Sequence, residues 1–210
     1  MSSNTSPLSD SDPVGLIDLD GSVADFDKAM RTQLEALRSP DEDPTLDETA
    51  YEDVKHIKAR RRLIKSQPGF WRNLEPLPLG FQVVEEMRRL RYRLHVLSKG
   101  PIRVPAAWAE KIEWCGRHLA DVQITLSEDK GLVYGRVLLD DWPEYIEAWL
   151  AHRTRGFVIA VAQPWNVRIE RQFPGRVLRY DGHNFDVMSA RLMAIREDYR
   201  AQHRLASSTE

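Results

Sequence analysis

The sequence predicts an α/β protein whose parallel sheet is flanked by helices. Short apolar runs alternate with stretches in which apolar residues recur at helical spacing, and this alternation is typical of parallel sheets. The chain has 210 residues, of which 42% are hydrophobic and 30% charged, as in folded globular proteins rather than disordered ones. Because domains hold about 150 residues, the length allows one domain with a modest insert.

The amino-terminal part of the chain begins with one predicted strand and two predicted helices. The strand is the apolar run 14–17, which stops abruptly at the turn 18–21, where the sequence is DLDG. Residues 23–38 then have apolar side chains at helical spacing, and a Ser-Pro pair ends this helix. A second helix over 51–66 is densely basic and ends at a Pro-Gly pair.

The rest of the chain alternates between helices and strands. A helix that starts near Phe81 is followed by a strand over 94–97, a helix over 106–119, strands over 122–126, 137–139 and 157–161, and a closing helix over 186–203. Residues 1–12 and 206–210 are polar and show no periodicity, so we expect them to be disordered tails.

Nothing in the sequence predicts a membrane span or a secretory signal. No apolar run reaches the roughly 18 residues that a membrane helix needs, and the first dozen residues lack an apolar segment. Cys115 is the only cysteine, so no disulfide forms within the chain, which fits a reducing compartment. We therefore expect a cytoplasmic protein with no membrane partner, in which Cys115 is buried.

The formal net charge of −2 conceals a strong segregation of charge along the chain. Residues 1–53 carry 14 acidic and 3 basic side chains, whereas residues 54–103 carry 13 basic and 3 acidic ones. Such asymmetry is typical of proteins that bind phosphates or nucleic acids. A basic helix of this kind is more often a solvated surface, and pairing to the acidic loop 41–48 is a further interpretation that stays open.

Charged and polar residues follow four of the predicted strands. They are Asp18 and Asp20 after the first, Ser98 and Lys99 after the second, Lys130 in the loop beyond the third, and Asp140 and Asp141 after the fourth. Because ligands bind at the carboxyl ends of parallel strands, we expect these side chains to meet there. Clustered carboxylates repel one another unless a hard cation lies among them. We therefore predict Mg²⁺ bound by Asp18 together with Asp140 or Asp141, and by a backbone carbonyl near Asp20.

The same residues suit phosphoryl transfer through a covalent intermediate. We assign Asp18 as the nucleophile that attacks phosphorus, and Asp20 as the general acid and then the general base. Gly21 lets the chain turn without a Cβ near the phosphate, and the Ser98-Lys99 pair holds phosphate oxygens together with backbone N–H groups. Lys130 neutralises the charge that develops in the transition state.

Four segments, in this order, resemble the motifs of the haloacid dehalogenase-like phosphohydrolases. They are VGLIDLDGSVAD at 14–25, Leu97-Ser98, Lys130, and LLDD at 138–141. Within that superfamily the sequence most resembles the 5′(3′)-deoxyribonucleotidases, through DLDGSVADF, FWRNLEPLPLGFQVVEEM, EDK and LLDD. The resemblance extends over most of residues 14–180, and the ordered combination of motifs is specific, although each motif alone is weak.

The resemblance implies a Mg²⁺-dependent phosphomonoester hydrolase, with a 5′-nucleotidase acting on (deoxy)nucleoside monophosphates as the leading assignment. It implies a Rossmann-like core over 13–25 and 80–205, and a small helical cap over 26–79 inserted after the first strand. Phe26, Phe70 and Trp71 become candidates for an aromatic wall against a nucleobase, although Phe70 and Trp71 suit the core of the cap equally well. The expected partner is a small phosphomonoester and not a long nucleic acid, and a homodimer is compatible with the sequence.

The sequence departs from the family at three places. Ser98-Lys99 replaces a Thr-Ser pair, Glu128 replaces an arginine two positions before Lys130, and one extra residue lies near Leu79-Gly80. Two alternatives therefore stay open. One is a phosphatase for a phosphosugar, another small metabolite or a polynucleotide end. The other is a non-catalytic protein that binds a phosphate ligand or nucleic acid, for which we expect no turnover and, with nucleic acid, affinity that falls steeply with salt.

Overall fold

The computed structural model describes residues 12–43 and 54–207, which form one six-stranded sheet with helices around it. The strands are β1 (Val14–Ile17), β2 (Arg93–Ser98), β3 (Gln123–Leu126), β4 (Val137–Asp140), β5 (Phe157–Val161) and β6 (Val177–Tyr180). They lie in the order β3-β2-β1-β4-β5-β6, and each neighbouring pair is parallel. This arrangement confirms the predicted α/β fold with a Rossmann-like parallel sheet.

Helices cover both faces of the sheet. They are α4 (Pro78–Arg89), α5 (Pro105–His118), α6 (Pro143–Ala151), α7 (Ile169–Gln172) and α8 (Phe185–Ser207), with short 3₁₀ turns at η1 (Lys130–Leu132) and η2 (Pro164–Asn166). Successive strand residues point to opposite faces. Leu138 therefore packs in the cluster that contains Trp149 of α6, whereas Leu139 packs in the cluster that contains Met87 of α4 and Leu192 of α8. Among the helices described, none is long and apolar enough to cross a bilayer.

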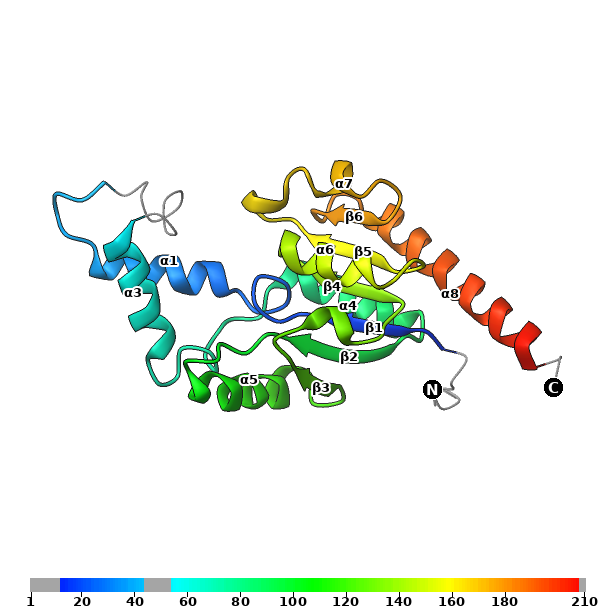
Figure 1. The fold of residues 1–210 in the computed structure, drawn as a ribbon, viewed down its shortest axis with the longest axis horizontal. Coiled ribbons are helices and arrows are strands. Elements are labelled where there is room, and N and C mark those ends of the chain that lie inside the picture. The colour runs from blue at the N-terminus through cyan, green and yellow to red at the C-terminus, as the bar shows by residue number, and fades with distance from the viewer. Residues whose placement is uncertain (1–11, 44–53, 208–210) are drawn as a thin grey trace, which may run out of the picture.

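Two helices, α1 (Phe26–Leu37) and α3 (Lys55–Ser66), lie between β1 and α4 in the chain. Asp25 begins α1 by accepting a hydrogen bond from the backbone N–H of Lys28 at 3.1 Å. The two helices contact each other, and Figure 1 shows them together at one end of the molecule, away from the carboxyl end of α8. They fall within residues 26–79, and we propose that this range forms the cap.

Charged side chains join the loop after α1 to the basic helix α3. Arg60 Nη1 donates to both carboxylate oxygens of Glu42, at 2.8 and 2.7 Å, and His56 Nε2 lies 2.7 Å from Glu42 Oε1. Pairing between the acidic loop and the basic helix is therefore present at this position. Asp47 and Glu48 of that loop, and residues 51–53 of the expected basic helix, lie outside the described residues.

The structure corrects three details of the sequence prediction. Strand β6 was absent from it, because the four residues VLRY hold no clear apolar run or alternation. Asp12, assigned to the amino-terminal tail, is 1% exposed and accepts hydrogen bonds from Arg200. Helix α8 reaches Ser207, so the helix continues into the expected carboxyl-terminal tail. Residues 1–11 and 208–210 of the expected tails lie outside the described part of the chain.

Candidate active site

Three buried carboxylates meet where β1 and β4 end. Asp18 directly follows β1, Asp140 ends β4, and Asp141 follows it. The backbone N–H of Asp18 donates to the carbonyl of Leu139 at 2.9 Å, so the pairing of the two strands continues up to the site. One oxygen from each of the three carboxylates lies within 4.8 Å of the others. An all-oxygen cluster of this kind fits a hard divalent cation.

The electrostatics of this cluster favour a bound cation as well. Burial raises the pKa of Asp140 to about 6 and raises the pKa of Asp141 well above its ordinary range, and the neighbouring carboxylates add to both shifts. These shifts express the free-energy cost of holding several negative charges together away from water. A cation among the carboxylates would offset that cost, because its charge dominates the local field.

The two neighbouring aspartates have different surroundings. Asp140 is fully buried, its Oδ1 accepts the backbone N–H groups of Asp141 and Trp142 at 2.9 and 3.0 Å, and its Oδ2 accepts Lys130. Asp141 accepts Ser22 Oγ at 3.2 Å and Trp165 Nε1 at 3.1 Å, and its side chain lines the adjoining cavity. The oxygens of both aspartates therefore have partners within the protein, but of the two only Asp141 lines the cavity.

Lys130 joins two of the carboxylates from the start of η1. Its Nζ lies 2.7 Å from Asp18 Oδ1 and 2.8 Å from Asp140 Oδ2, and its side chain is 2% exposed. Burial lowers the pKa of Lys130, but Asp140 and Asp18 outweigh this effect and hold the pKa above its ordinary value. Asp129 caps the turn by accepting the N–H of Gly131 at 2.9 Å, which fixes the backbone beside Lys130.

Asp20 is held by a residue that the sequence did not reveal as part of the site, Lys111 of α5. Lys111 Nζ lies 2.5 Å from Asp20 Oδ2 and also donates to Ser98 Oγ at 3.0 Å and to the carbonyl of Lys99 at 2.7 Å. Asp20 Oδ1 is buried and has no hydrogen-bond partner among the described residues. Burial raises the pKa of Asp20, Lys111 opposes this, and Asp18 adds to the rise.

The predicted phosphate-binding residues occupy three different settings. Gly21 has φ +76°, and an added Cβ would lie 2.4 Å from Asp141 Oδ2, so only glycine fits the turn. Lys99 lines the cavity with its Nζ 5.1 Å from the centre of the Tyr145 ring. Ser98 is fully buried and faces Lys111. Gly21 and Lys99 therefore border the cavity, whereas Ser98 lies behind it.

A cavity of about 510 Å³ brings these residues together with aromatic and basic side chains. Its lining includes the predicted site residues Asp18, Asp20, Gly21, Phe26, Trp71, Lys99, Lys130 and Asp141, and also Arg31, Arg61, Lys65, Trp142, Tyr145 and Trp165. Phe26 and Trp71 stack on each other with ring centres 5.4 Å apart. Residues of α1, of α3 and of the loop after α3 thus provide one side of the cavity, and the ends of the strands provide the other.

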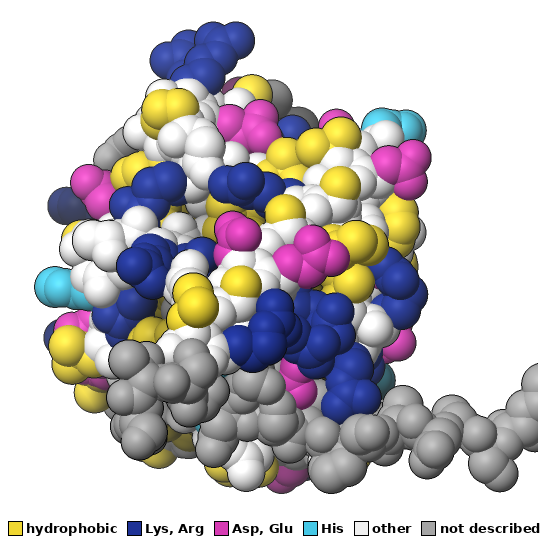
Figure 2. Space-filling model, turned by 90° about the vertical axis from the view of Figure 1, so that its right-hand side faces the viewer, with side chains coloured by type: hydrophobic (Ala, Val, Ile, Leu, Met, Phe, Trp, Pro, Cys, Tyr) yellow, Lys and Arg dark blue, Asp and Glu magenta, His cyan; other side chains and the backbone are white. Residues whose placement is uncertain are grey.

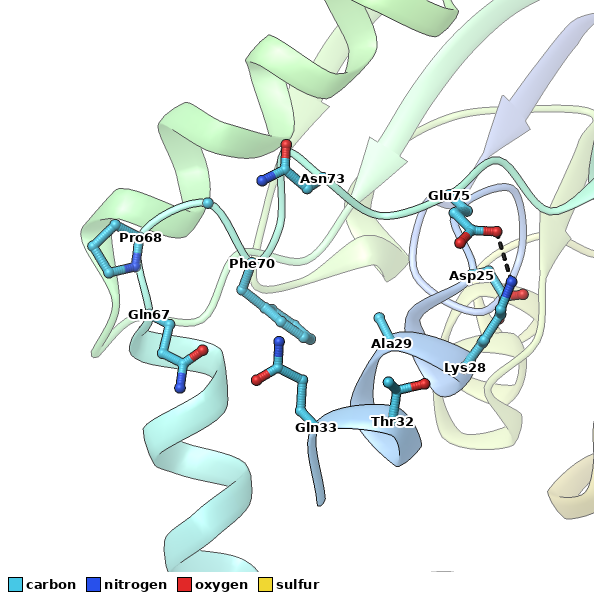
Figure 3. Close-up of a pocket in the computed structure, with 11 residues that line it drawn as sticks. Asp25, Lys28, Ala29, Thr32, Gln33, Gln67, Pro68, Phe70, Asn73 and Glu75 are labelled. Atoms are coloured by element: carbon cyan, nitrogen blue, oxygen red, sulfur yellow. Dashed lines mark hydrogen bonds and ion pairs between the residues drawn. The ribbon is translucent and has the colours of Figure 1, made fainter. Parts of the chain in front are cut away.

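Phe70 does not line this cavity. It packs edge-on against Phe26 and Trp71, with ring centres 5.7 and 5.3 Å away. Its other surroundings are a separate hollow of about 290 Å³ between α1 and the loop after α3, where Figure 3 shows Phe70 beside Gln33 and the Lys28 to Glu75 ion pair at the far end. Phe70 therefore supports the aromatic pair from behind.

Glu110, next to Lys111 on α5, fixes the loop that carries Trp71. It is 5% exposed, and its carboxylate accepts the backbone N–H groups of Gly69 at 2.6 Å and Trp71 at 3.1 Å. Of these two buried residues of α5, Lys111 thus holds Asp20 and Glu110 holds the loop with Trp71, and Asp20 and Trp71 both line the cavity. One feature of the sequence could have indicated Glu110 and Lys111. They lie on the same helix face as Trp114 and Cys115, and apolar residues are usual on such a buried face.

Comparisons with known proteins agree with this geometry. The family model described as 5′ nucleotidase, deoxy (pyrimidine), cytosolic type C protein matches residues 12–184. A Bordetella bronchiseptica protein named as a 5′(3′)-deoxyribonucleotidase is 31% identical over 141 residues, which cover 61% of this chain and 73% of the relative. The human mitochondrial 5′(3′)-deoxyribonucleotidase is 30% identical over 149 residues, covering 61% of this chain and 62% of that protein.

One solved structure supports the fold. A protein from Burkholderia xenovorans LB400 described as a haloacid dehalogenase-like hydrolase superposes with a TM-score of 0.51 at 16% identity, covering 87% of this chain and 98% of that one. Because the family model matches most of the chain, the chain belongs to the family of 5′ nucleotidase, deoxy (pyrimidine), cytosolic type C proteins.

Proposed function

We propose that this chain is a cytoplasmic, Mg²⁺-dependent 5′-nucleotidase that hydrolyses deoxynucleoside monophosphates through an aspartyl phosphate on Asp18. The observation that carries the proposal is the cavity in which Asp18, Asp20 and Lys130 lie on the same lining as the stacked pair of Phe26 and Trp71. A nucleophile, a proton carrier, a cation and a flat apolar surface are the groups that a nucleotide phosphatase needs.

In the first step the carboxylate of Asp18 attacks phosphorus. A bond forms between an Asp18 oxygen and phosphorus, and the bond between phosphorus and the nucleoside oxygen breaks. Asp20 donates a proton to the departing oxygen, and burial supports this role by raising the pKa of Asp20. In the second step Asp20 takes a proton from a water molecule that attacks phosphorus, which releases phosphate and restores the carboxylate of Asp18. Lys130 balances the negative charge in both steps.

We assign the metal ligands as Asp18, Asp141 and the backbone carbonyl of Asp20. Asp141 is preferred to Asp140 because it lines the cavity, whereas Asp140 lies outside the lining and its Oδ2 is 2.8 Å from Lys130 Nζ. Asp140 then orients Lys130 and the turn after β4. When bound, Mg²⁺ supplies positive charge that stabilises the phosphate oxygens and draws them toward the nucleophile.

Three basic side chains on the cap side of the cavity favour a second candidate substrate. Arg31, Arg61 and Lys65 line the cavity, with Asp27 as the one acidic residue from the cap. A substrate with a second anionic group, such as a deoxynucleoside 3′,5′-bisphosphate, would gain from these charges. Arg61→Gln should then reduce kcat/KM for the bisphosphate more than for the monophosphate. Arg62→Gln is the matched control, because Arg62 is exposed and does not line the cavity.

A screen of phosphomonoesters tests the proposal. We expect the wild-type protein to release phosphate from deoxynucleoside monophosphates with added Mg²⁺ and to lose this activity in EDTA. Asp18→Asn serves as the blank and should fold normally. Preferential hydrolysis of phosphosugars would replace the substrate assignment, and undiminished activity of the Asp18→Asn protein would overturn the mechanism.

A further inference from the structure

A row of arginines lies along the edge of the sheet opposite the active site. Arg136 directly precedes β4, Arg155 precedes β5 by two positions, and Arg176 directly precedes β6. Because β4, β5 and β6 are neighbouring parallel strands, their beginnings meet at one edge. Helix α8 adds Arg191 there, and we call these four residues the arginine edge. Figure 2 views the molecule from this end and shows Lys and Arg side chains gathered on it.

The arginine edge borders two adjoining cavities. All four of its arginines line one cavity of about 210 Å³, in which Asp198 is the one acidic residue. A second cavity of about 390 Å³ shares Arg136 and Arg155 with the first and is lined further by Arg153, two histidines and two tyrosines, without an acidic residue. The charge of the combined hollow is therefore strongly positive, and its shape is concave rather than a flat solvated surface.

The arginines are held by neutral partners. Arg176 Nη2 donates to the carbonyls of Leu150 and Arg153, Arg191 Nη2 donates to the carbonyl of Gly175 at 3.0 Å, and Arg155 Nη1 donates to Gln202 Oε1 at 2.7 Å. In the described part of the chain, none of the four forms an ion pair with a carboxylate. Three of the guanidinium groups are thus positioned by neutral acceptors, and the one carboxylate in the lining they share is that of Asp198.

Arg136 is the least satisfied member of the arginine edge. It is half-buried, and its Nε and Nη1 are buried without a hydrogen-bond partner among the described residues. Buried donors without partners are rare and costly in proteins, particularly on a charged group. Burial lowers the pKa of Arg136 and the charge of Arg155 adds to this effect, whereas Tyr134, Tyr92 and Asp198 oppose it. An anion in the cavity would offset the positive charge gathered around it.

We propose that the arginine edge binds a small ligand with two or more phosphate groups, at a site separate from the catalytic cavity. Guanidinium groups match phosphate oxygens with paired hydrogen bonds, and several phosphates are needed to engage arginines from three strand starts and α8. The concave shape and limited volume of the two cavities favour a compact polyphosphate over an extended nucleic acid, whose backbone needs a continuous exposed track. This site is independent of the proposed function.

Calorimetric titration with inorganic triphosphate tests the proposal. The full chain is titrated at fixed, low salt without added Mg²⁺, with a deoxynucleoside monophosphate present to occupy the catalytic cavity. We expect saturable binding that weakens at least about 10-fold in Arg136→Gln/Arg155→Gln, because each charged hydrogen bond contributes a factor of this order. If the double variant fails to fold, the exposed Arg155→Gln alone should still weaken binding.

Two control variants and one competing ligand make the result decisive. Arg103→Gln/Arg117→Gln removes the same charge from exposed positions outside both cavities and should leave binding within about 2-fold. If triphosphate binding weakens equally in that variant, net charge alone explains the effect. Weakening in Arg61→Gln would place the ligand in the catalytic cavity. Tighter binding of single-stranded DNA, with affinity that grows with its length, would make the ligand a nucleic acid. Each of these three results overturns the proposal.

Discussion

The substitution Lys111→Met removes the ammonium group that holds Asp20, and we expect it to destabilise the folded protein strongly. Lys111 Nζ lies 2.5 Å from Asp20 Oδ2, with side chains 2% and 26% exposed, respectively. Removing one partner of a buried ion pair costs about 3–5 kcal/mol, and the partial exposure of Asp20 favours the lower end of that range. In a domain of this size a loss of about 3 kcal/mol lowers Tm by roughly 6–12 °C.

Lys28→Met is the matched control for this prediction. Lys28 Nζ lies 2.7 Å from Glu75 Oε2, a similar distance, but the two side chains are 58% and 67% exposed. Exposed pairs contribute about 0–1 kcal/mol, so Tm should fall by no more than roughly 4 °C. Thermal unfolding followed by circular dichroism, without Mg²⁺, compares the variants. Adding Asp20→Asn to Lys111→Met should restore part of the loss. Equal Tm values for the Lys111 and Lys28 variants would refute the reasoning from burial.

Three further predictions concern the site and its surroundings. Gly21→Ala should weaken the activation by Mg²⁺ about 10–100-fold, because the added Cβ displaces Asp141. Gly175→Ala is the control and should not weaken it, because Gly175 has a similar φ of +73° but open space around it. A titration of activity with Mg²⁺ compares the two variants. A hydrogen bond from Arg60 lowers the pKa of Glu42 to about 2, so the carboxylate stabilises the fold above about pH 4.5 and loses this effect as the pH falls toward 2. Glu42→Gln should therefore lower Tm at pH 7 and progressively less below pH 4.5, and equal Tm at pH 7 would contradict this. Burial raises the pKa of Cys115 to about 11, so a thiol reagent at pH 8 should label the protein only after unfolding in urea, and full labelling of the native protein would contradict its burial.

The sequence predicted those parts of the fold and site whose signals are local. Strand β5 is a continuous apolar run, and all five of its residues are buried. The two acidic motifs stand directly after apolar runs, so the rule that ligands bind at strand ends was sufficient to bring Asp18 and Asp141 together. Strand β6 gave no such signal, because its pairing partner and not its own composition makes it a strand.

Long-range contacts explain what the sequence could not predict. Lys111 meets Asp20 across 91 residues, and nothing near either residue indicates the partner. Phe70 and Trp71 are adjacent in the chain, but only Trp71 lines the catalytic cavity, because Glu110 fixes the backbone between them from another helix. The arginine edge is equally invisible in the sequence, since its members lie in separate segments that only the parallel sheet aligns.

Detection of the covalent intermediate tests the central claim most directly. In Asp20→Asn the second step lacks its base, and with p-nitrophenyl phosphate the leaving group needs no proton in the first step. We therefore expect acid-quenched Asp20→Asn protein, mixed with Mg²⁺ and ³²P-labelled substrate, to carry phosphate that hydroxylamine releases and that maps to the peptide containing Asp18. The Asp18→Asn protein should carry none. Turnover without labelled protein, or label on a peptide that lacks Asp18, would contradict the assignment of Asp18 as the nucleophile.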